Sequence, residues 1–188
     1  LEKEEELTNN LSVCYRCGTA IEPLSSKQWF ISVDKKIERL GNKSLKEKSI
    51  EAAQSEEIKF IPERFNKRYL DWMNNLHDWC ISRQIWFGHQ IPVWYKGEDV
   101  YTGLEAPSGE GWVQDQDTLD TWFSSGMWTF STLGWPTNYQ GSKKSGDLAK
   151  FHPTQVLETG YELITLWISR MIMMSFFALD EIPFSKVY

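Results

Sequence analysis

The sequence has 188 residues, enough for one substantial domain or two small ones with a buried core. A formal net charge of -6 argues against a generally basic nucleic-acid binder, although a local basic patch is compatible with that total. The hydrophobic share of 41% and the aromatic share of 14% are typical of a folded protein and exclude a disordered one.

Neither a signal peptide nor a membrane span is expected. Residues 1–11 are charged and polar, without the apolar segment of a signal peptide. The longest apolar run, residues 163–179, contains Arg170 and is flanked by Glu162 and Asp180, so it is expected to be a buried helix. Three cysteines do not suggest a secreted disulfide framework, and we expect a cytoplasmic protein.

The first part of the chain, residues 1–62, is predicted to form a small α+β segment. Residues 28–33 combine aromatic and β-branched side chains, which is typical of a strand. Residues 35–55 are rich in Lys and Glu and predict a surface helix, interrupted at Gly41. A short strand over 58–61 should end at Pro62.

The clearest amphipathic helix follows residue 63. Asn66 is a candidate N-cap. One apolar face is predicted from residues spaced i, i+3, i+4 and i+7, namely Tyr69, Trp72, Met73 and Leu76. Beyond it, Gly88 and Pro92 interrupt residues 79–95, which therefore predict extended segments and turns.

The last part of the chain has the pattern of α/β units. A short helix is predicted over 119–130 and a surface loop over 134–146. Residues 154–160 predict a strand that ends in a glycine turn, and 161–179 a helix that is apolar nearly all round and buried against a sheet. Another strand begins within 182–188, so we expect the chain to be a piece of a longer protein.

The predicted strand, the glycine turn at Gly160 and the predicted helix after it form a unit of the kind that can bind a nucleotide. In open parallel sheets, ligands bind beyond the carboxyl ends of the strands, where glycine allows close backbone approach and helix N-termini favour negative charge. A single glycine after a strand is more often only a turn, so both interpretations stay open.

Cys14 and Cys17 have the spacing of half a tetrahedral zinc site. A complete site needs two further ligands, and Cys80, His77, His89 and His152 are the remaining candidates. The alternative is a pair of unliganded thiols, and we expect no tightly bound zinc in this chain alone.

No Ser/His/Asp elbow, P-loop or H-E-x-x-H motif occurs in the sequence. Asp117 and Asp120 are explained most simply as a helix N-cap and a first-turn charge, with a catalytic role as the alternative. For Trp122, Trp128 and Trp167, core packing is the default explanation.

Five sequence blocks resemble class I valyl-tRNA synthetases and lie in that family's order. They are residues 78–95 (DWCISRQIWFGHQIPVWY), 119–136 (LDTWFSSGMWTFSTLGWP), 156–171 (VLETGYELITLWISRM), 14–30, which holds CYRC and SKQWF, and 58–64 (IKFIPER). The first three resemble the catalytic domain, and the last two resemble the exit of the family's editing insertion.

The resemblance implies an α/β fold, the second half of a doubly wound, Rossmann-like nucleotide-binding sheet with a small α+β connecting segment. Residues 1–62 would be the exit of the editing insertion, and 63–188 the downstream, incomplete half of the catalytic domain. The family activates valine with ATP, together with Mg, as an adenylate and transfers the acyl group to tRNA. Its partners would therefore be valine, ATP and tRNA.

The resemblance also implies site residues. Trp122 and Trp167 should wall the valine side-chain pocket, with Leu163 adding an aliphatic surface. Thr159, Gly160 and Glu162 should face the adenosine ribose and the amino-acid backbone, although the family commonly has Asp at the position of Glu162. In the family, a second cysteine pair would complete the zinc site of Cys14 and Cys17.

Two family motifs, His-Ile-Gly-His and Lys-Met-Ser-Lys-Ser, are absent from this sequence. Because they supply much of the ATP phosphate binding, the chain alone is expected to be inactive, with no catalytic residue of its own. It is also expected to self-associate. The alternatives are a non-catalytic synthetase-like module that binds tRNA or a protein partner, and a zinc-knuckle binding module.

Overall fold

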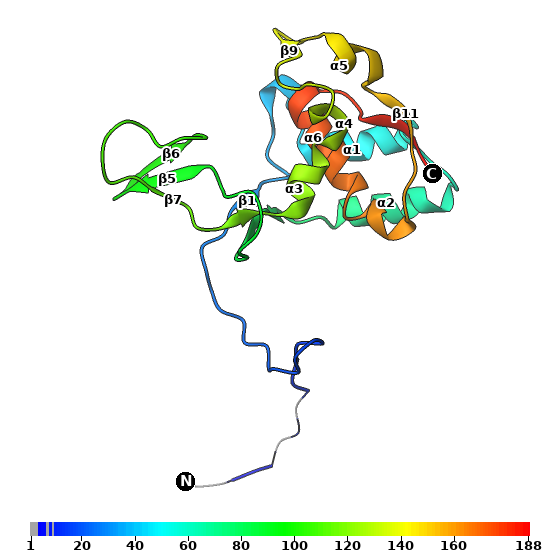
Figure 1. The fold of residues 1–188 in the computed structure, drawn as a ribbon. Coiled ribbons are helices and arrows are strands. Elements are labelled where there is room, and N and C mark those ends of the chain that lie inside the picture. The colour runs from blue at the N-terminus through cyan, green and yellow to red at the C-terminus, as the bar shows by residue number, and fades with distance from the viewer. Residues whose placement is uncertain (1–3, 7, 9) are drawn as a thin grey trace.

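The computed structural model describes residues 4–6, 8 and 10–188, which form a helical body, a protruding β-ribbon and an N-terminal segment that runs away from both (Figure 1). The helices of the body are α1 (Leu45–Gln54), α2 (Arg64–Asn74), α3 (Thr121–Gly126), α4 (Trp128–Ser131), α5 (Gly146–Phe151) and α6 (Ile168–Leu179), with short 3-10 helices η1 (Glu38–Leu40) and η2 (Tyr161–Ile164).

A three-stranded parallel sheet organises one side of the body. It is built from β11 (Thr154–Leu157), β12 (Phe184–Val187) and β2 (Lys59–Phe60), with β12 in the centre. Val156 pairs with Lys186, which in turn pairs with Lys59. The connection from β11 to β12 runs through η2 and α6, as expected for parallel strands, which need a long crossover. The predicted α/β class is therefore confirmed.

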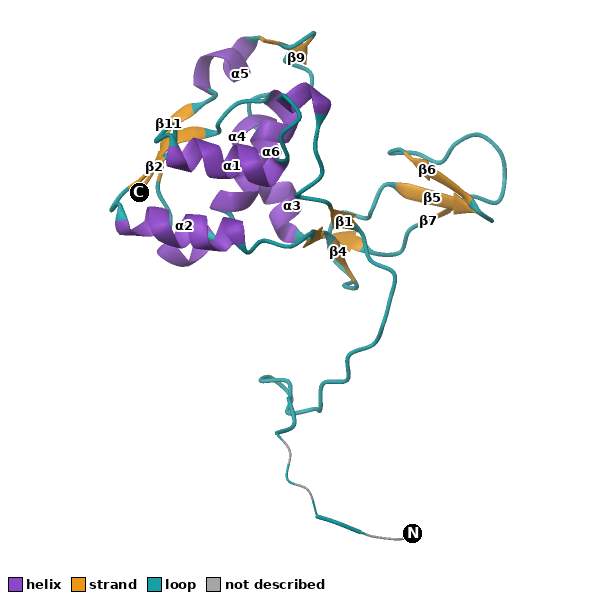
Figure 2. Ribbon diagram, turned by 180° about the vertical axis from the view of Figure 1, so that it is seen from behind, coloured by secondary structure: helices purple, strands orange, loops and turns teal. Residues whose placement is uncertain are grey.

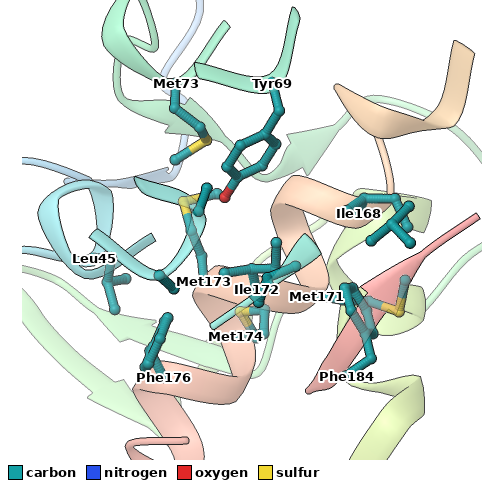
Figure 3. Close-up of a cluster of buried hydrophobic side chains, with 14 of the residues drawn as sticks. Leu45, Tyr69, Met73, Ile168, Met171, Ile172, Met173, Met174, Phe176 and Phe184 are labelled. Atoms are coloured by element: carbon teal, nitrogen blue, oxygen red, sulfur yellow. The ribbon is translucent and has the colours of Figure 1, made fainter. Parts of the chain in front are cut away.

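Helix α6 is the centre of the hydrophobic core. Its residues Ile168, Met171 and Ile172 are fully buried. Helices α1 and α3 pack directly on α6, and Figure 3 shows side chains of α2 and β12 converging on the same cluster. Burial on nearly all sides explains why the sequence of this helix lacks a polar face.

The apolar run is interrupted in the structure, although one continuous helix was predicted over 161–179. Residues 161–164 form the 3-10 helix η2, and the α-helix begins only at Ile168. Tyr161–Leu179 would be long and apolar enough to cross a membrane, but 61% of it is buried inside the protein. It is thus a core element, as the buried Arg170 within it also indicates.

Helix α1 begins with a capping box, in which the Ser44 hydroxyl accepts from the Glu47 backbone N–H and the Glu47 carboxylate accepts from the Ser44 N–H. Gly41 has a left-handed backbone (φ 68) and separates α1 from η1, as the sequence predicted. The predicted surface helix is amphipathic: Glu47 and Glu51 are exposed on its outer face, while Leu45, Ala52 and Ala53 are buried against the body.

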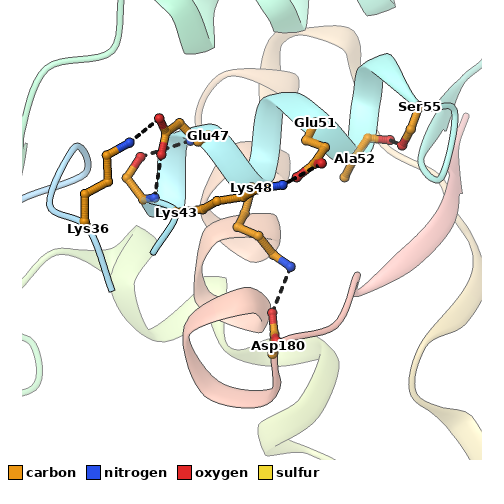
Figure 4. Close-up of polar contacts among 9 residues, drawn as sticks. Lys36, Lys43, Glu47, Lys48, Glu51, Ala52, Ser55 and Asp180 are labelled. Carbon is orange, nitrogen blue, oxygen red and sulfur yellow. Dashed lines mark hydrogen bonds and ion pairs between the residues drawn. The ribbon is translucent and has the colours of Figure 1, made fainter. Parts of the chain in front are cut away.

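The outer face of α1 carries ion pairs. Lys43 pairs with Glu51, and Lys36 pairs with Glu47 (Figure 4). Lys48 reaches Asp180, the residue after α6, at 3.0 Å. Exposed pairs of this kind contribute little stability individually, so α1 is held mainly by its apolar face.

Helix α2 buries the predicted face, with Tyr69 and Met73 fully inaccessible to solvent. The predicted N-cap was wrong: α2 begins at Arg64, after Glu63, and Asn66 is its third residue. Glu63 occupies the N-cap position without a side-chain capping bond. The N–H groups of Phe65 and Asn66 donate instead to the backbone carbonyls of Pro62 and Glu63.

Two further predictions need correction in detail. The helix expected over 119–130 is two short helices, α3 and α4, preceded by strand β8 (Thr118–Leu119). The loop expected over 134–146 contains a small hairpin of β9 (Tyr139–Gln140) and β10 (Lys143–Lys144).

The remaining strands are antiparallel and lie toward the ribbon (Figure 2). Strand β1 (Phe30–Ile31) pairs with β3 (Trp79–Cys80), and β4 (Ser82–Arg83) pairs with β8. The ribbon itself consists of β5 (Val93–Lys96), β6 (Asp99–Thr102) and β7 (Val113–Gln114), consistent with the predicted extended segments. Strand β2 belongs to the predicted segment 1–62, yet it pairs with β12 of the predicted segment 63–188. The division of the chain at residue 62 stays a prediction.

Candidate active site

The carboxyl ends of the parallel strands meet at one edge of the sheet, where a small apolar groove of about 190 Å³ lies. Phe65 and Tyr161 stack beside it, with ring centroids 6.2 Å apart and planes 9° apart. The guanidinium of Arg68 lies 5.3 Å from the centre of the Tyr161 ring. This edge therefore offers an aromatic surface beside the positive charge of Arg68. Such a surface can bind a ligand that has a flat ring and a negatively charged group close to that ring.

The three residues expected to face a nucleotide lie at this edge. The Thr159 backbone N–H donates to the Tyr188 carbonyl at 3.0 Å, and Thr159 lines the groove. Gly160 precedes η2, and the carboxylate of Glu162 folds back over it: a Cβ at Gly160 would lie 2.6 Å from Glu162 Oε1. The structure thus brings Thr159, Gly160 and Glu162 together, with the flexible carboxylate of Glu162 close to the backbone of Gly160.

The expected valine-pocket residues are carried by three neighbouring elements: Trp122 by α3, Leu163 by η2, and Trp167 by the N-cap position of α6. The indole Nε1 of Trp167 donates to the Ser125 carbonyl at 2.9 Å. Ser125 lies one turn beyond Trp122 on α3, so the two tryptophans are carried by contacting helices. Leu163 precedes Trp167 by one turn, and its carbonyl accepts from the Trp167 N–H at 2.8 Å. Trp122 and Trp167 are both partly buried against the core.

Trp128 is half exposed, and its ring lies 6.1 Å from that of Trp167. Both explanations offered by the sequence thus remain compatible with Trp167: it contacts the core, and it also presents surface beside α3. The assignment of Trp122, Trp167 and Leu163 to a valine pocket stays a prediction.

Asp120 occupies the N-cap position of α3, but its side chain makes no capping hydrogen bond. Its Oδ2 instead accepts from Trp79 Nε1 at 3.0 Å and pairs with Arg83 Nη2 at 3.0 Å. The prediction of an N-cap and a first-turn charge was therefore wrong in its chemistry: neither the carboxylate of Asp120 nor that of Asp117 caps α3, and the first turn of α3 contains no acidic residue. Asp117 lies before β8, outside the first helical turn, and accepts from Gln84 Nε2 at 2.6 Å.

A buried arginine, Arg170, lies over the face of the Trp79 ring. The Arg170 guanidinium is 4.4 Å from the Trp79 ring centre, and its Nη1 is buried without a hydrogen-bond partner among the described residues. Burial lowers the pKa of Arg170 to about 10, while the carboxylate of Asp120 acts in the opposite direction. Arg170 is still protonated at neutral pH, so a full positive charge is held against the indole face.

Cys14 and Cys17 lie in a tight turn of the N-terminal segment, in which the Gly18 N–H donates to the Cys14 carbonyl at 2.8 Å. Hydrogen bonding with the Thr19 side chain lowers the pKa of Cys17 to about 7, which favours the thiolate that metals bind. Three of the other candidate ligands have partners elsewhere: His89 contacts Ser124, His152 contacts Ser175, and the Cys80 thiol donates to Gln28 Oε1. Within residues 4–6, 8 and 10–188, no three His, Cys, Asp or Glu side chains are grouped as a metal site.

Sequence reasoning missed Phe65, Tyr161, Trp79 and Arg170. The first two meet only because β2 and β11 end at the same sheet edge. The contact between Trp79 and Arg170 could have been suspected from the sequence, because an arginine inside an otherwise apolar helix needs a partner for its charge.

The sequence of this chain is similar to those of known proteins. The family model described as tRNA synthetases class I (I, L, M and V) matches residues 3–108 and 98–188. The chain is 48% identical over its full length to a valine–tRNA ligase of Clostridium tetani, and 49% identical over 90% of its length to one of Streptomyces coelicolor. It spans about a fifth of the length of these relatives, 20% and 18% respectively.

A solved structure shares the fold. The methionyl-tRNA synthetase of Mycobacterium tuberculosis, bound by methionyl-adenylate, aligns with 97% of this chain and 30% of its own, with a TM-score of 0.61 at 12% identity. The resemblance to valyl-tRNA synthetases is confirmed by the relatives, and the Rossmann-like class by the shared fold. The chain belongs to the family of class I tRNA synthetases (I, L, M and V).

Proposed function

We propose that this chain is part of a valine–tRNA ligase, in which it supplies one wall of the valine pocket and part of the adenylate site. The main support is the 48% identity over the whole chain to a relative named as that ligase. The placement of Trp167 against the helix of Trp122 agrees with a pocket between α3 and α6.

The residues of this chain would act by binding and orientation. Trp122, Trp167 and Leu163 offer apolar surface of the kind that a branched aliphatic side chain needs. Thr159 and Gly160 offer a polar backbone edge, and Glu162 a carboxylate that can accept from ribose hydroxyls or an ammonium group. ATP with Mg would supply the adenylyl group for activation: the valine carboxylate would bond to the α-phosphorus and pyrophosphate would leave. The longer protein would supply the phosphate-binding motifs.

Zinc is part of the proposal only for the longer protein. The two thiolates of Cys14 and Cys17 are suitable ligands, but two ligands do not complete a tetrahedral structural site. A second cysteine pair from outside this sequence would have to close it.

Valine-dependent exchange between ATP and pyrophosphate tests the proposal in the full-length protein that contains this chain. Exchange that depends on valine, followed by valine transfer to tRNA, is the expected result. A full-length protein that binds tRNA but shows neither reaction would instead support a non-catalytic synthetase-like module.

A further inference from the structure

We propose that Trp79 is a positioning residue that links α3 to α6 and thereby sets the width of the amino-acid pocket between them. The inference rests on the proposed function, because it concerns the pocket assigned to Trp122 and Trp167. Trp79 belongs to neither helix; it lies on β3, just before the stretch that leads to the ribbon.

One side of Trp79 is tied to α3. Its Nε1 donates at 3.0 Å to Oδ2 of Asp120, the residue that starts α3, and this hydrogen bond is buried. The Trp79 ring also packs against Phe123 of α3, with centroids 6.0 Å apart. A hydrogen bond to an ionised, buried carboxylate is stronger than a neutral one, so it fixes both the indole and the start of the helix.

The other side of Trp79 is tied to α6. The Arg170 guanidinium lies 4.4 Å from the ring centre, and Arg170 is only 8% exposed. A cation over an indole face is attracted most strongly when both are desolvated, as they are here. Arg170 follows Trp167 by three residues, so this contact lies one turn from the indole of the proposed pocket.

Packing between the two helices leaves little freedom once Trp79 is in place. A Cβ at Gly126 of α3 would come within 3.3 Å of Arg170 Cβ and 3.2 Å of Met174 Cγ. Gly126 is the last residue of α3, whereas Trp79 contacts Asp120 at its start and Phe123 in its middle, so these contacts together restrict the angle of α3 to α6. A change at Trp79 would let the first turn of α3, which carries Trp122, move relative to Trp167.

The charged groups around Trp79 indicate that this residue positions its neighbours and does not merely fill the core. Asp120 is 5% exposed, and its carboxylate accepts from Trp79 Nε1 and pairs with Arg83, while the Arg170 guanidinium lies over the face of the same indole. The buried anion and cations thus compensate one another around Trp79. An apolar residue of similar volume would fill the space, but it would not align Asp120 and Arg170.

The test uses Trp79→Phe in the full-length protein, because phenylalanine keeps an aromatic face for Arg170 and removes the Nε1 donor to Asp120. KM and kcat for valine, and the ratio of kcat/KM for valine to that for isoleucine, are measured by pyrophosphate exchange and normalised to folded protein. We expect KM for valine to rise about tenfold and the ratio to change, with a smaller effect on kcat, as a misplaced pocket wall weakens binding. Hydrogen exchange of the α3 amides should also rise about tenfold, while that of α1 stays unchanged.

Ser175→Ala is the matched control. Ser175 is fully buried on the same helix, and its hydroxyl donates to the Glu181 carbonyl at 2.8 Å, far along α6 from Trp167. This variant should lower Tm without changing KM for valine or the exchange of α3. Asp120→Asn, which replaces the charge-assisted hydrogen bond from Trp79 with a weaker neutral one and removes the ion pair with Arg83, provides a second variant if Trp79→Phe does not fold. It should change KM for valine, the ratio and α3 exchange in the same direction.

The outcomes separate the two hypotheses. If the wild-type protein shows no valine-dependent exchange, the proposed function fails, and α3 hydrogen exchange in the variants still decides whether Trp79 positions the helix. If the wild type is active and both variants leave KM, the ratio and α3 exchange as in Ser175→Ala, Trp79 merely packs the core and the inference is overturned.

Discussion

Trp167→Ala in the full-length protein would test whether the indole of Trp167 walls the valine pocket. Trp167 is partly buried, contacts the ring of Trp128 at 6.1 Å and donates to the Ser125 carbonyl at 2.9 Å. Truncation removes all these contacts. We expect the variant to accept a larger aliphatic side chain in the space that the indole leaves.

The stability cost follows from the same contacts. Truncating a fully buried tryptophan costs about 3–5 kcal/mol, and a partly buried one should cost roughly half of that. Trp167→Phe is a milder companion, since it removes only the indole N–H and some area. The Ser125 carbonyl also accepts from the Met127 N–H, so it is not left unpaired, and the phenylalanine variant should lose only about 1 kcal/mol.

Selectivity distinguishes a pocket wall from a core residue. One methylene in an apolar pocket corresponds to about 1–3 kcal/mol, so kcat/KM for valine relative to isoleucine should change roughly tenfold or more in Trp167→Ala. The assay is adenylate formation with each amino acid, normalised to the folded fraction from thermal unfolding. If both activities fall together and their ratio is unchanged, Trp167 belongs to the core, and Trp122 remains the only aromatic wall.

Four further predictions concern the isolated chain. It should catalyse no valine-dependent pyrophosphate exchange, because it lacks the phosphate-binding motifs, and exchange above a no-enzyme control would contradict this. Elemental analysis should find less than one zinc per chain, because only Cys14 and Cys17 are close together; stoichiometric zinc would require ligands from another copy. Light scattering should show a dimer or larger assembly that Val156→Lys shifts toward monomer, since Val156 is 51% exposed on the β11 edge; a monomer at all concentrations would refute it. Stability should fall as pH drops from about 6.5 to about 4, because burial lowers the pKa of His152 to about 4 and the unfolded chain binds the proton first; His152→Gln should flatten this slope in urea titrations.

The predicted self-association concerns a sheet edge rather than the apolar helix α6. Helices α1 and α3 pack on α6 within the chain, so most of its apolar surface is buried. The open edge of β11 remains, and Val156 lies there beside a groove of about 250 Å³ that includes Phe151 and Trp128. We therefore expect the contact between copies at this edge, where the single substitution Val156→Lys can test it.

Much of this protein could be predicted from the sequence because the relevant signals are local. The apolar spacing of α2, the strand that ends at Pro62 and the unit of strand, glycine and helix around Gly160 each depend on neighbouring residues. The sequence blocks that resemble a synthetase family are also local, and they identified the class that the comparisons confirm. Burial of α6 followed from its lack of a polar face.

The tertiary structure decided which partners the polar residues take. Asp120 has the sequence position of a cap, yet its carboxylate binds Trp79 and Arg83, because strands β3 and β4 bring those side chains to the start of α3. Nothing near Arg170 in the sequence shows that its guanidinium lies over an indole some 90 residues earlier. Contacts of this kind depend on how separate elements pack in three dimensions, and periodicity within one element carries no information about them.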